Sequence, residues 1–257
     1  MTLIVGIICK DAVLLAGESE TTREVAKFQG THKLHLVAFE NGYVMIGEAG
    51  SAYPAGVCLD AFRRRAASTK ITSEDTIPET LNLAFREYAK ACIGPPIGSL
   101  ESQDFHRSEI NRFDFILGYF GDRPCLYNFS STYGMACKCS RRFEMIGIGD
   151  ELAEYILKEM PLEDFSSRAA ANAAVYVVGE VKTSVSGCGG DTQITVVSSG
   201  NKPERLSRAT IQDIELHLSG FLKEHKQKTA EGLQTMLRMA GMAYMPAPED
   251  WWQPSSP

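Results

Sequence analysis

The chain has 257 residues, with 26 lysines and arginines against 32 aspartates and glutamates, for a formal net charge of −6. Hydrophobic residues make up 44% and charged residues 23%, which excludes a disordered chain, a collagen-like fibre and a coiled coil. The mild acidity argues against a nucleic-acid-binding protein. No stretch reaches the ~18 consecutive apolar residues that span a bilayer, and the N-terminus lacks the basic region of a signal peptide. We therefore expect a cytoplasmic protein that binds neither nucleic acid nor membrane.

The first fifty residues predict two β-hairpins. Strands are expected at 3–9, 12–16, 34–39 and 43–46, with Asn-Gly turn chemistry between the last two. These strands are almost continuously apolar, which indicates burial on both faces.

The remaining chain alternates helix pairs with runs of strands. Helices are predicted at 51–67, 77–92, 150–160 and 162–182, with a C-terminal amphipathic helix around 211–222; strands are predicted at 113–120, 125–129, 143–146 and 192–198. The order lacks regular βαβ alternation, so a doubly wound parallel sheet is not expected. The pattern favours two mainly antiparallel sheets with helix layers outside, an α+β fold.

The chain shows no internal repeat and no interdomain linker. We predict a single domain over 1–245, with a loop insertion at about 94–111 that is either a functional lip or a mobile segment. Residues 246–257 hold four prolines and two tryptophans and predict an irregular tail.

The seven cysteines are odd in number and scattered, which predicts reduced thiols rather than a disulfide framework. Cys137 and Cys139 have the spacing of half a metal site, but no second Cys/His pair completes it. The chain also has no glycine-rich nucleotide-binding motif. We therefore expect no metal and no cofactor.

The N-terminus carries the first chemical signal. Thr2 follows Met1 and is small enough for methionine aminopeptidase to expose it as the first residue. A free α-amine has a pKa near ~8, so it can act as a general base for the adjacent hydroxyl. The alternative interpretation is that Met1-Thr2 is an ordinary start sequence and that Thr2 has no catalytic role.

Four segments of the N-terminal third add to this signal. The sequences Thr2-Leu3-Ile4-Val5-Gly6-Ile7, Lys10 to Glu18, Thr31-His32-Lys33-Leu34 and Ile46-Gly47-Glu48-Ala49-Gly50 together resemble the proteasome β-subunit and HslV family, as a divergent bacterial-type member. The resemblance implies threonine peptidase activity and the four-layer αββα sandwich of N-terminal nucleophile (Ntn) hydrolases.

The resemblance also implies site residues. Thr2 matches the nucleophile, Lys33 the lysine that assists proton transfer, and Glu18 the acidic residue that pairs with it. A surface ion pair is the alternative for Glu18 and Lys33. Gly47 matches the glycine whose N–H stabilises the oxyanion.

Further positions match the substrate pocket or supporting groups. Thr21, Met45 and Ala49 match the pocket for the residue before the scissile bond, with core packing as the alternative for Met45. Ile148 stands where a serine is usual, and Val185 where an aspartate is usual. Ser184, Ser186 and Cys188 remain as candidate supporting residues.

Three functions follow from this reading. The first is a peptidase that hydrolyses peptide or unfolded-protein substrates within a homo-oligomeric ring, with an ATP-dependent unfoldase as a candidate partner. The second is an inactive ring subunit, favoured by Ile148 and the unmatched aspartate. The third is an Ntn amidase outside a closed assembly.

Overall fold

The computed structural model describes residues 2–23, 26–28, 30–93 and 112–220. The predicted insertion at 94–111 and the tail at 246–257 lie outside the described residues. The chain divides into two compact units, Met1–Ile214 and Glu215–Pro257. In the second unit the described residues 215–220 are helical.

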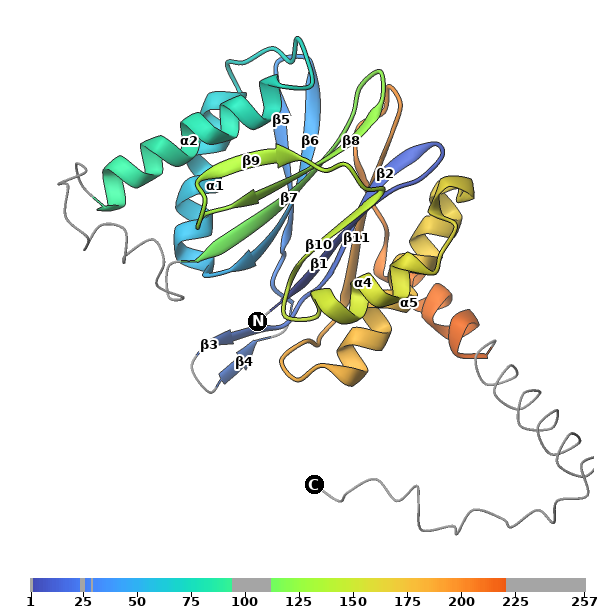
Figure 1. The fold of residues 1–257 in the computed structure, drawn as a ribbon. Coiled ribbons are helices and arrows are strands. Elements are labelled where there is room, and N and C mark those ends of the chain that lie inside the picture. The colour runs from blue at the N-terminus through green and yellow to red at the C-terminus, as the bar shows by residue number, and fades with distance from the viewer. Residues whose placement is uncertain (1, 24–25, 29, 94–111, 221–257) are drawn as a thin grey trace, which may run out of the picture. The chain divides into compact units, whose positions relative to one another are not determined.

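The first unit contains two five-stranded antiparallel sheets and helices, as expected for an α+β fold (Figure 1). The first sheet has the order β10-β1-β2-β11-β12, the second sheet has the order β5-β6-β7-β8-β9, and β3 and β4 form a separate hairpin. The elements in chain order are β1 (Leu3–Ile8), β2 (Ala12–Glu18), β3 (Thr21–Arg23), β4 (Ala26–Phe28), β5 (Leu34–Phe39), β6 (Gly42–Gly50), α1 (Ala52–Ala66), α2 (Thr76–Ile93), β7 (Phe113–Phe120), β8 (Pro124–Ser130), β9 (Met135–Lys138), β10 (Phe143–Gly147), α4 (Asp150–Lys158), the 3₁₀ helix η1 (Leu162–Asp164), α5 (Ser167–Ser184), β11 (Thr192–Ser198) and β12 (Glu204–Arg205).

Both predicted hairpins are present, since β1 pairs with β2 and β5 pairs with β6. All seven residues of β2 are buried, which agrees with the apolar run of its first six residues, Ala12 to Gly17. The short strands β3, β4, β9 and β12 were not predicted. Sequences such as Thr-Thr-Arg in β3 and Met-Ala-Cys-Lys in β9 lack the apolar alternation that marks a strand. These segments are strands because they pair with a neighbouring strand, β3 with β4 and β9 with β8.

The predicted helix at 162–182 begins later than expected. Residues Leu162–Asp164 form the 3₁₀ helix, and α5 starts at Ser167 after Ser166, whose hydroxyl accepts a hydrogen bond from the N–H of Ala169. A serine that caps the free N–H groups of the first turn fixes the start of a helix more strongly than alanine content does. The predicted helix 150–160 ends at Lys158.

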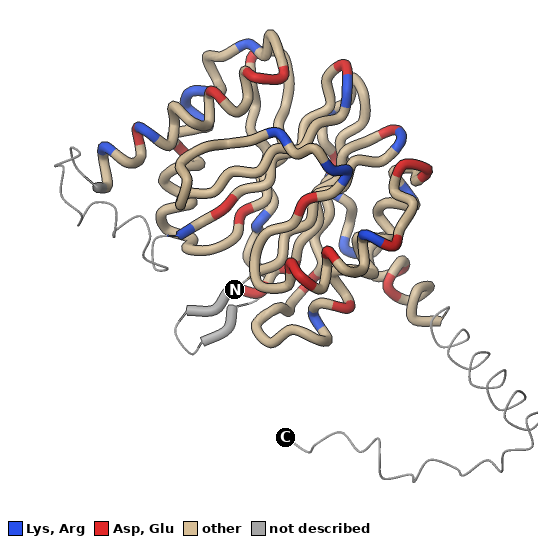
Figure 2. Tube along the Cα trace, in the orientation of Figure 1, with Lys and Arg blue, Asp and Glu red and all other residues tan. Residues whose placement is uncertain are grey.

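Two clusters of buried residues lie one on each face of the second sheet. A cluster that includes Phe62, Leu81, Phe113 and Phe129 packs α1 and α2 against one face. A second cluster joins the two sheets and includes Ile4 and Leu15 of the first sheet and Met45 and Ile116 of the second. Helix α5 buries an alanine- and valine-rich face. The helices and turns carry most of the charged residues, and the strands are mainly uncharged (Figure 2).

The cysteines agree with the reduced state that the sequence predicts, because all seven are free thiols. Among the described residues, no helix is both long enough and apolar enough to cross a membrane.

We predict that Gly147→Ala strongly destabilises the fold. Gly147 has φ +105°, and a Cβ there would lie 1.7 Å from the carbonyl oxygen of Thr2. Gly200→Ala is the matched control, since Gly200 has φ +70° and nothing within 4 Å of the added atom. Denaturant unfolding should show that the free energy of unfolding falls by about 3 kcal/mol or more in Gly147→Ala and by about 1 kcal/mol in Gly200→Ala. Equal losses would contradict the role given to this contact.

Candidate active site

Thr2 lies at the entry of β1, where two elements hold its backbone in place. Its carbonyl accepts a hydrogen bond of 2.9 Å from the N–H of Ile148, which follows β10. The next residue, Leu3, pairs with Gly147 in the ladder between β1 and β10. Only 6% of Thr2 is exposed. Thr2 is thus held at the start of an interior strand of the sheet, which gives its side chain a rigid position.

Glu18 and Lys33 form a buried ion pair beside Thr2, with 0% and 4% of their side chains exposed. Glu18 ends β2 in the first sheet, and Lys33 immediately precedes β5 in the second. Lys33 Nζ lies 2.7 Å from Glu18 Oε1 and 2.6 Å from Thr2 Oγ1. The surface ion pair considered as an alternative is therefore wrong.

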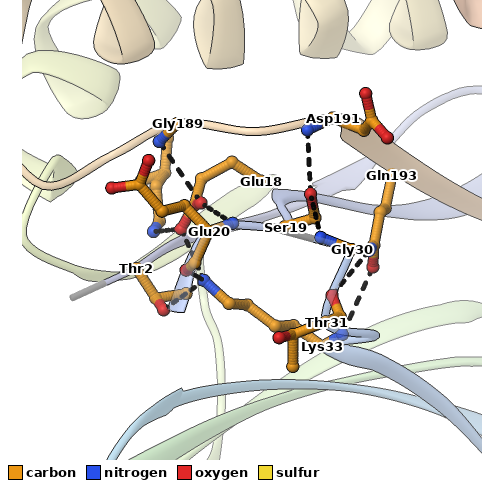
Figure 3. Close-up of polar contacts among 11 residues, drawn as sticks. Thr2, Glu18, Ser19, Glu20, Gly30, Thr31, Lys33, Gly189, Asp191 and Gln193 are labelled. Atoms are coloured by element: carbon orange, nitrogen blue, oxygen red, sulfur yellow. Dashed lines mark hydrogen bonds and ion pairs between the residues drawn. The ribbon is translucent and has the colours of Figure 1, made fainter. Parts of the chain in front are cut away.

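The ammonium of Lys33 donates three hydrogen bonds, to Thr2 Oγ1, to Glu18 Oε1 and to the backbone carbonyl of Glu20 (Figure 3). Three is the full donor capacity of a lysine. Burial lowers the pKa of Lys33 from its ordinary value, and the hydrogen bond and charge of Glu18 act in the opposite direction. Lys33 therefore presents a positive charge to the Thr2 hydroxyl while holding its proton less tightly than a solvated lysine does.

A glutamine that the sequence analysis missed fixes the backbone of Lys33. Gln193 in β11 accepts a hydrogen bond of 3.2 Å from the N–H of Lys33 and donates one of 2.8 Å to the carbonyl of Thr31. Gln193 is only 9% exposed. It ties the segment before β5 to the first sheet. No pattern in the sequence marks Gln193, because its partners lie about 160 positions away along the chain.

The polar residues that follow Glu18 are also part of this site. Ser19 and Glu20 are 0% and 5% exposed. The hydroxyl of Ser19 accepts hydrogen bonds from the N–H of Gly30 and from the N–H of Asp191. The sequence does carry a signal for them, because Glu18-Ser19-Glu20 is a run of three polar residues directly after the apolar run Ala12 to Gly17. A surface turn would be the ordinary interpretation of such a run.

The geometry does not favour Gly47 as an oxyanion donor. The N–H of Glu48 donates to the carbonyl of Lys33, on the β5 side of β6. Successive N–H groups of a strand point to opposite sides, so the N–H of Gly47 points to β7, where its partner is Ile116. A Cβ at Gly47 would lie 2.4 Å from Cγ2 of Ile4. Close packing of the two sheets therefore explains this glycine without an oxyanion.

Two of the three predicted pocket residues are buried between the two sheets. Met45 and Ala49 are 1% and 4% exposed and belong to the cluster between the sheets, which agrees with core packing for Met45. Thr21 begins β3, opposite Phe28 of β4. A cavity of about 600 Å³ is lined by residues of β8, β9, β10 and α4, and none of the predicted site residues lines it.

The predicted supporting residues divide into two groups. Ser184 ends α5 and is exposed, as is Ser186, whereas Cys188 is only 6% exposed. Burial and then the negative charge of Glu18 raise the pKa of Cys188 to about 11, so its thiol is neutral near pH 7. A neutral buried thiol is not an activated nucleophile. The side chain of Ile148 is 45% exposed, and this residue contributes its backbone N–H to Thr2 instead.

The described residues contain no cluster of three or more His, Cys, Asp or Glu side chains that would hold a metal ion. Thr2, Glu18 and Lys33 combine a hydroxyl, an ammonium within hydrogen-bond distance of it and a carboxylate that orients the ammonium, which is the form of an activated nucleophile.

Comparison with known proteins gives similarity at the level of structure. No protein-family model and no curated protein matches the chain. Among solved structures, a mutant Anbu from Hyphomicrobium sp. strain MC1 is similar with a TM-score of 0.68 and 16% identity, covering 89% of this chain and 97% of that one. Anbu from Yersinia bercovieri, described as an ancestral beta-subunit, has a TM-score of 0.64 and 15% identity over 96% and 99% of the two chains. Anbu from Pseudomonas aeruginosa, described as a helical assembly, has a TM-score of 0.65 and 14% identity, covering 98% of this chain and 100% of that one.

These similarities correct the family assignment made from the sequence. The assignment to the proteasome β-subunit and HslV family is wrong, because the structural neighbours are Anbu proteins, a distinct proteasome-like family, and no family model or curated protein supports an HslV-like chain. The motifs around Thr2, Glu18 and Lys33 lie on strands of a fold that is shared more widely than one family, so they could not separate its members. At these identities the chain is similar to Anbu in fold alone.

We predict that Lys33→Met destabilises the protein by about 3–5 kcal/mol, because it leaves buried carboxylates without their cation. Lys138→Met is the control. Lys138 pairs with Glu74 at the surface, where the side chains are 51% and 42% exposed, and its loss should cost no more than about 1 kcal/mol. Denaturant unfolding monitored by circular dichroism measures both. A loss for Lys33→Met as small as that of the control would contradict the burial of the ion pair.

Proposed function

We propose that this chain is an N-terminal nucleophile hydrolase of the proteasome-like type, with Thr2 as nucleophile after removal of Met1. The observation that carries the proposal is the 2.6 Å contact between Lys33 Nζ and Thr2 Oγ1, in a buried site where Glu18 holds the lysine. The two antiparallel sheets and their helices support the four-layer αββα arrangement of this class.

In this proposal Thr2 hydrolyses a peptide bond in two stages. The α-amine takes the hydroxyl proton while Oγ forms a bond to the carbonyl carbon. The C–N bond then breaks, and the leaving amine receives that proton, which leaves an ester on Thr2. Water adds to the ester carbon and gives a proton to the α-amine. The C–Oγ bond breaks, the proton returns to Oγ, and a free carboxylic acid departs.

Glu18 and Lys33 have separate roles. The charge of Lys33 stabilises negative charge that develops on Oγ, and Glu18 orients Lys33. We do not assign the oxyanion donor to Gly47, because its N–H is directed to β7. We do not assign the substrate pocket to Met45 or Ala49, because both lie in the core. Peptides or unfolded proteins are the proposed substrate class.

We further propose that the protein works as a homo-oligomeric ring or related assembly. The similar Anbu from Pseudomonas aeruginosa is described as a helical assembly, which supports self-association of this fold. The cytoplasmic location, the unfoldase partner and the single domain over 1–245 stay predictions.

An inactive ring subunit is the second candidate. It is favoured by Ile148, which offers no side-chain hydroxyl, and by the exposure of Ser184 and Ser186. The two candidates differ in whether the Thr2 hydroxyl reacts. The third candidate, an Ntn amidase outside a closed assembly, differs from the peptidase in the substrate that it hydrolyses.

The reaction of Thr2 with a peptide epoxyketone tests the proposed function. This reagent forms a ring with both the hydroxyl and the free amine of an N-terminal threonine. Intact-mass spectrometry should record loss of Met1 and one adduct that maps to Thr2. Thr2→Ser should retain the adduct, and Thr2→Ala should lose both the adduct and peptide hydrolysis. Full hydrolysis by Thr2→Ala would contradict the proposal, and loss of Met1 without an adduct or hydrolysis would favour the inactive subunit.

The oligomeric state is tested separately by analytical ultracentrifugation of the full chain. Several copies should sediment together, as an integer multiple of the 28.2 kDa chain. The Thr2→Ala variant is a matched control, because it changes the nucleophile without changing the outer surface and should keep the same mass. A monomer at micromolar concentration would contradict the assembly.

A further inference from the structure

The edge strands of the two sheets differ in how their outer backbone groups are covered. At the edges of the second sheet, the N–H of Ala136 in β9 donates to Oδ1 of Asn82 at 2.8 Å, and the carbonyl of Leu34 in β5 accepts from Arg205 at 2.7 Å. In the first sheet, β12 has only two residues. The other edge strand, β10, has five residues, and within the described ranges no strand other than β1 pairs with it. Uncovered edges can pair with another chain.

The ladder between β1 and β10 identifies the open backbone groups. The N–H of Ile148 donates to the carbonyl of Thr2 at the end of this ladder. Hydrogen-bonded and non-bonded pairs alternate in an antiparallel ladder, so the even-numbered residues of β10 bond to β1. Phe143 and Met145 therefore direct their N–H and C=O groups away from β1. In the part of the chain that the structure describes, no hydrogen bond from outside the ladder reaches these groups.

The cavity of about 600 Å³ lies along this open edge. Phe143, Glu144 and Met145 of β10 line it, and its other walls come from β8, β9 and α4. Ile146 packs in the cluster between the sheets, so Glu144 shares that face of β10, while Phe143 and Met145 are on the opposite face. A cavity that meets side chains of both faces lies beside the strand rather than over one face. There is thus space where an additional strand would pair.

The walls of this cavity favour a basic and partly apolar occupant. Its charged side chains are Lys138, Arg141, Glu144, Asp150, Glu151 and Glu154. Both cations are already paired, Lys138 with Glu74 and Arg141 with Glu154. Among the described residues, Glu144, Asp150 and Glu151 form no ion pair, which leaves an acidic excess. Tyr133 and Met135 also line the cavity and are 83% and 54% exposed, so apolar surface is available for contact.

This inference rests on the proposed function. We propose that the open edge of β10 is a second binding site for the unfolded substrate, where an extended segment with basic and apolar side chains adds as a further strand. Backbone hydrogen bonds give such strand addition its affinity, and alternate side chains give it specificity. The five residues of β10 would pair with about five residues of the substrate, since both strands rise about 3.3 Å per residue.

The position of β10 relative to Thr2 favours the substrate as the occupant. β10 ends at Gly147, opposite Leu3, and the next residue, Ile148, binds the carbonyl of Thr2. Neighbouring strands are about 4.8 Å apart, so a strand added to β10 would lie about 10 Å from β1. The substrate would therefore be held close to the nucleophile at a site that leaves the Thr2 hydroxyl accessible.

Hydrogen exchange of single amides tests the pairing directly. The probe is a short unstructured peptide of alternating lysine, threonine and valine, added to the full-length Thr2→Ala chain, which cannot cleave it. The amides of Phe143 and Met145 should exchange quickly in the free protein and slowly with the peptide. The amides of Glu144 and Ile146 are internal controls, because they are already bonded to β1. Unchanged exchange at Phe143 and Met145 under saturating peptide would overturn the proposal.

The affinity of the same peptide, labelled with fluorescein, is measured by fluorescence anisotropy. Met145→Pro removes an outward N–H and keeps the ladder to β1, so binding should weaken at least about fivefold. Met145→Leu, which keeps the N–H, should bind as the parent does. A peptide methylated at alternate backbone nitrogens should also bind more weakly to the unaltered protein, and this comparison does not depend on the folding of a variant. Equal affinity of the methylated and unmethylated peptides would overturn strand addition.

The charge preference has its own matched pair of variants. Asp150→Asn with Glu151→Gln should weaken binding of the basic peptide about 3- to 10-fold at low salt. Glu163→Gln with Asp164→Asn is the control, since these exposed carboxylates also lie in the first turn of a helix and do not line the cavity. Replacing the lysines of the peptide by glutamates should abolish binding to the parent. Equal binding of both peptides would overturn the stated substrate chemistry.

Hydrolysis separates this inference from the proposed function. With the Thr2 chain, Met145→Pro should raise KM for the basic peptide about fivefold and leave kcat unchanged, because the edge binds substrate away from the reacting atoms. Peptide that protects Phe143 and Met145 but is never hydrolysed by the parent would overturn the proposed function and leave the binding site supported. Hydrolysis by the parent, with KM unchanged in Met145→Pro, would overturn the role of β10 alone.

Discussion

The buried ion pair between Glu18 and Lys33 is the interaction on which the rest of the site depends. Glu18 ends a strand of the first sheet, and Lys33 immediately precedes a strand of the second, so their 2.7 Å contact connects the two sheets. A buried charge pair is tolerated only when its remaining donors and acceptors are satisfied. This requirement accounts for the arrangement around the pair, where backbone N–H groups from β1, from the β2–β3 connection and from the Gly189 loop all converge on one carboxylate.

Satisfying the pair also places Thr2. The lysine has one donor left after Glu18 and the carbonyl of Glu20, and the Thr2 hydroxyl receives it. Thr2 cannot move away easily, because its own carbonyl accepts a hydrogen bond from Ile148 and because β1 is an interior strand of the first sheet. The same contacts that make the ion pair stable therefore position a hydroxyl beside a cation. Structural and chemical requirements coincide here, which is why a nucleophile can be proposed without a histidine.

The family assignment shows the limit of motif reasoning. The segments that carried the resemblance cover the four strands β1, β2, β5 and β6, which form two hairpins in the two facing sheets. Those strands bring Thr2, Glu18 and Lys33 together in this chain, and their spacing indicates the fold rather than a particular family. The features that differ here, such as Glu20 and Ile148, lie outside the matched pattern.

The sequence by itself determined the local elements with strong apolar patterns and the chemical types near the N-terminus. The apolar runs of β1 and β2 predicted buried strands, and Thr2 after Met1 indicated an exposable amine. Only the tertiary structure decided which residues share the site. Gln193 and Gly189 lie more than 150 positions from Glu18 or Lys33 along the chain, and no local pattern encodes such contacts. It also decided that Met45 and Ala49 pack in the core and that the Gly47 N–H points to β7, because these depend on which face of β6 meets the opposite sheet.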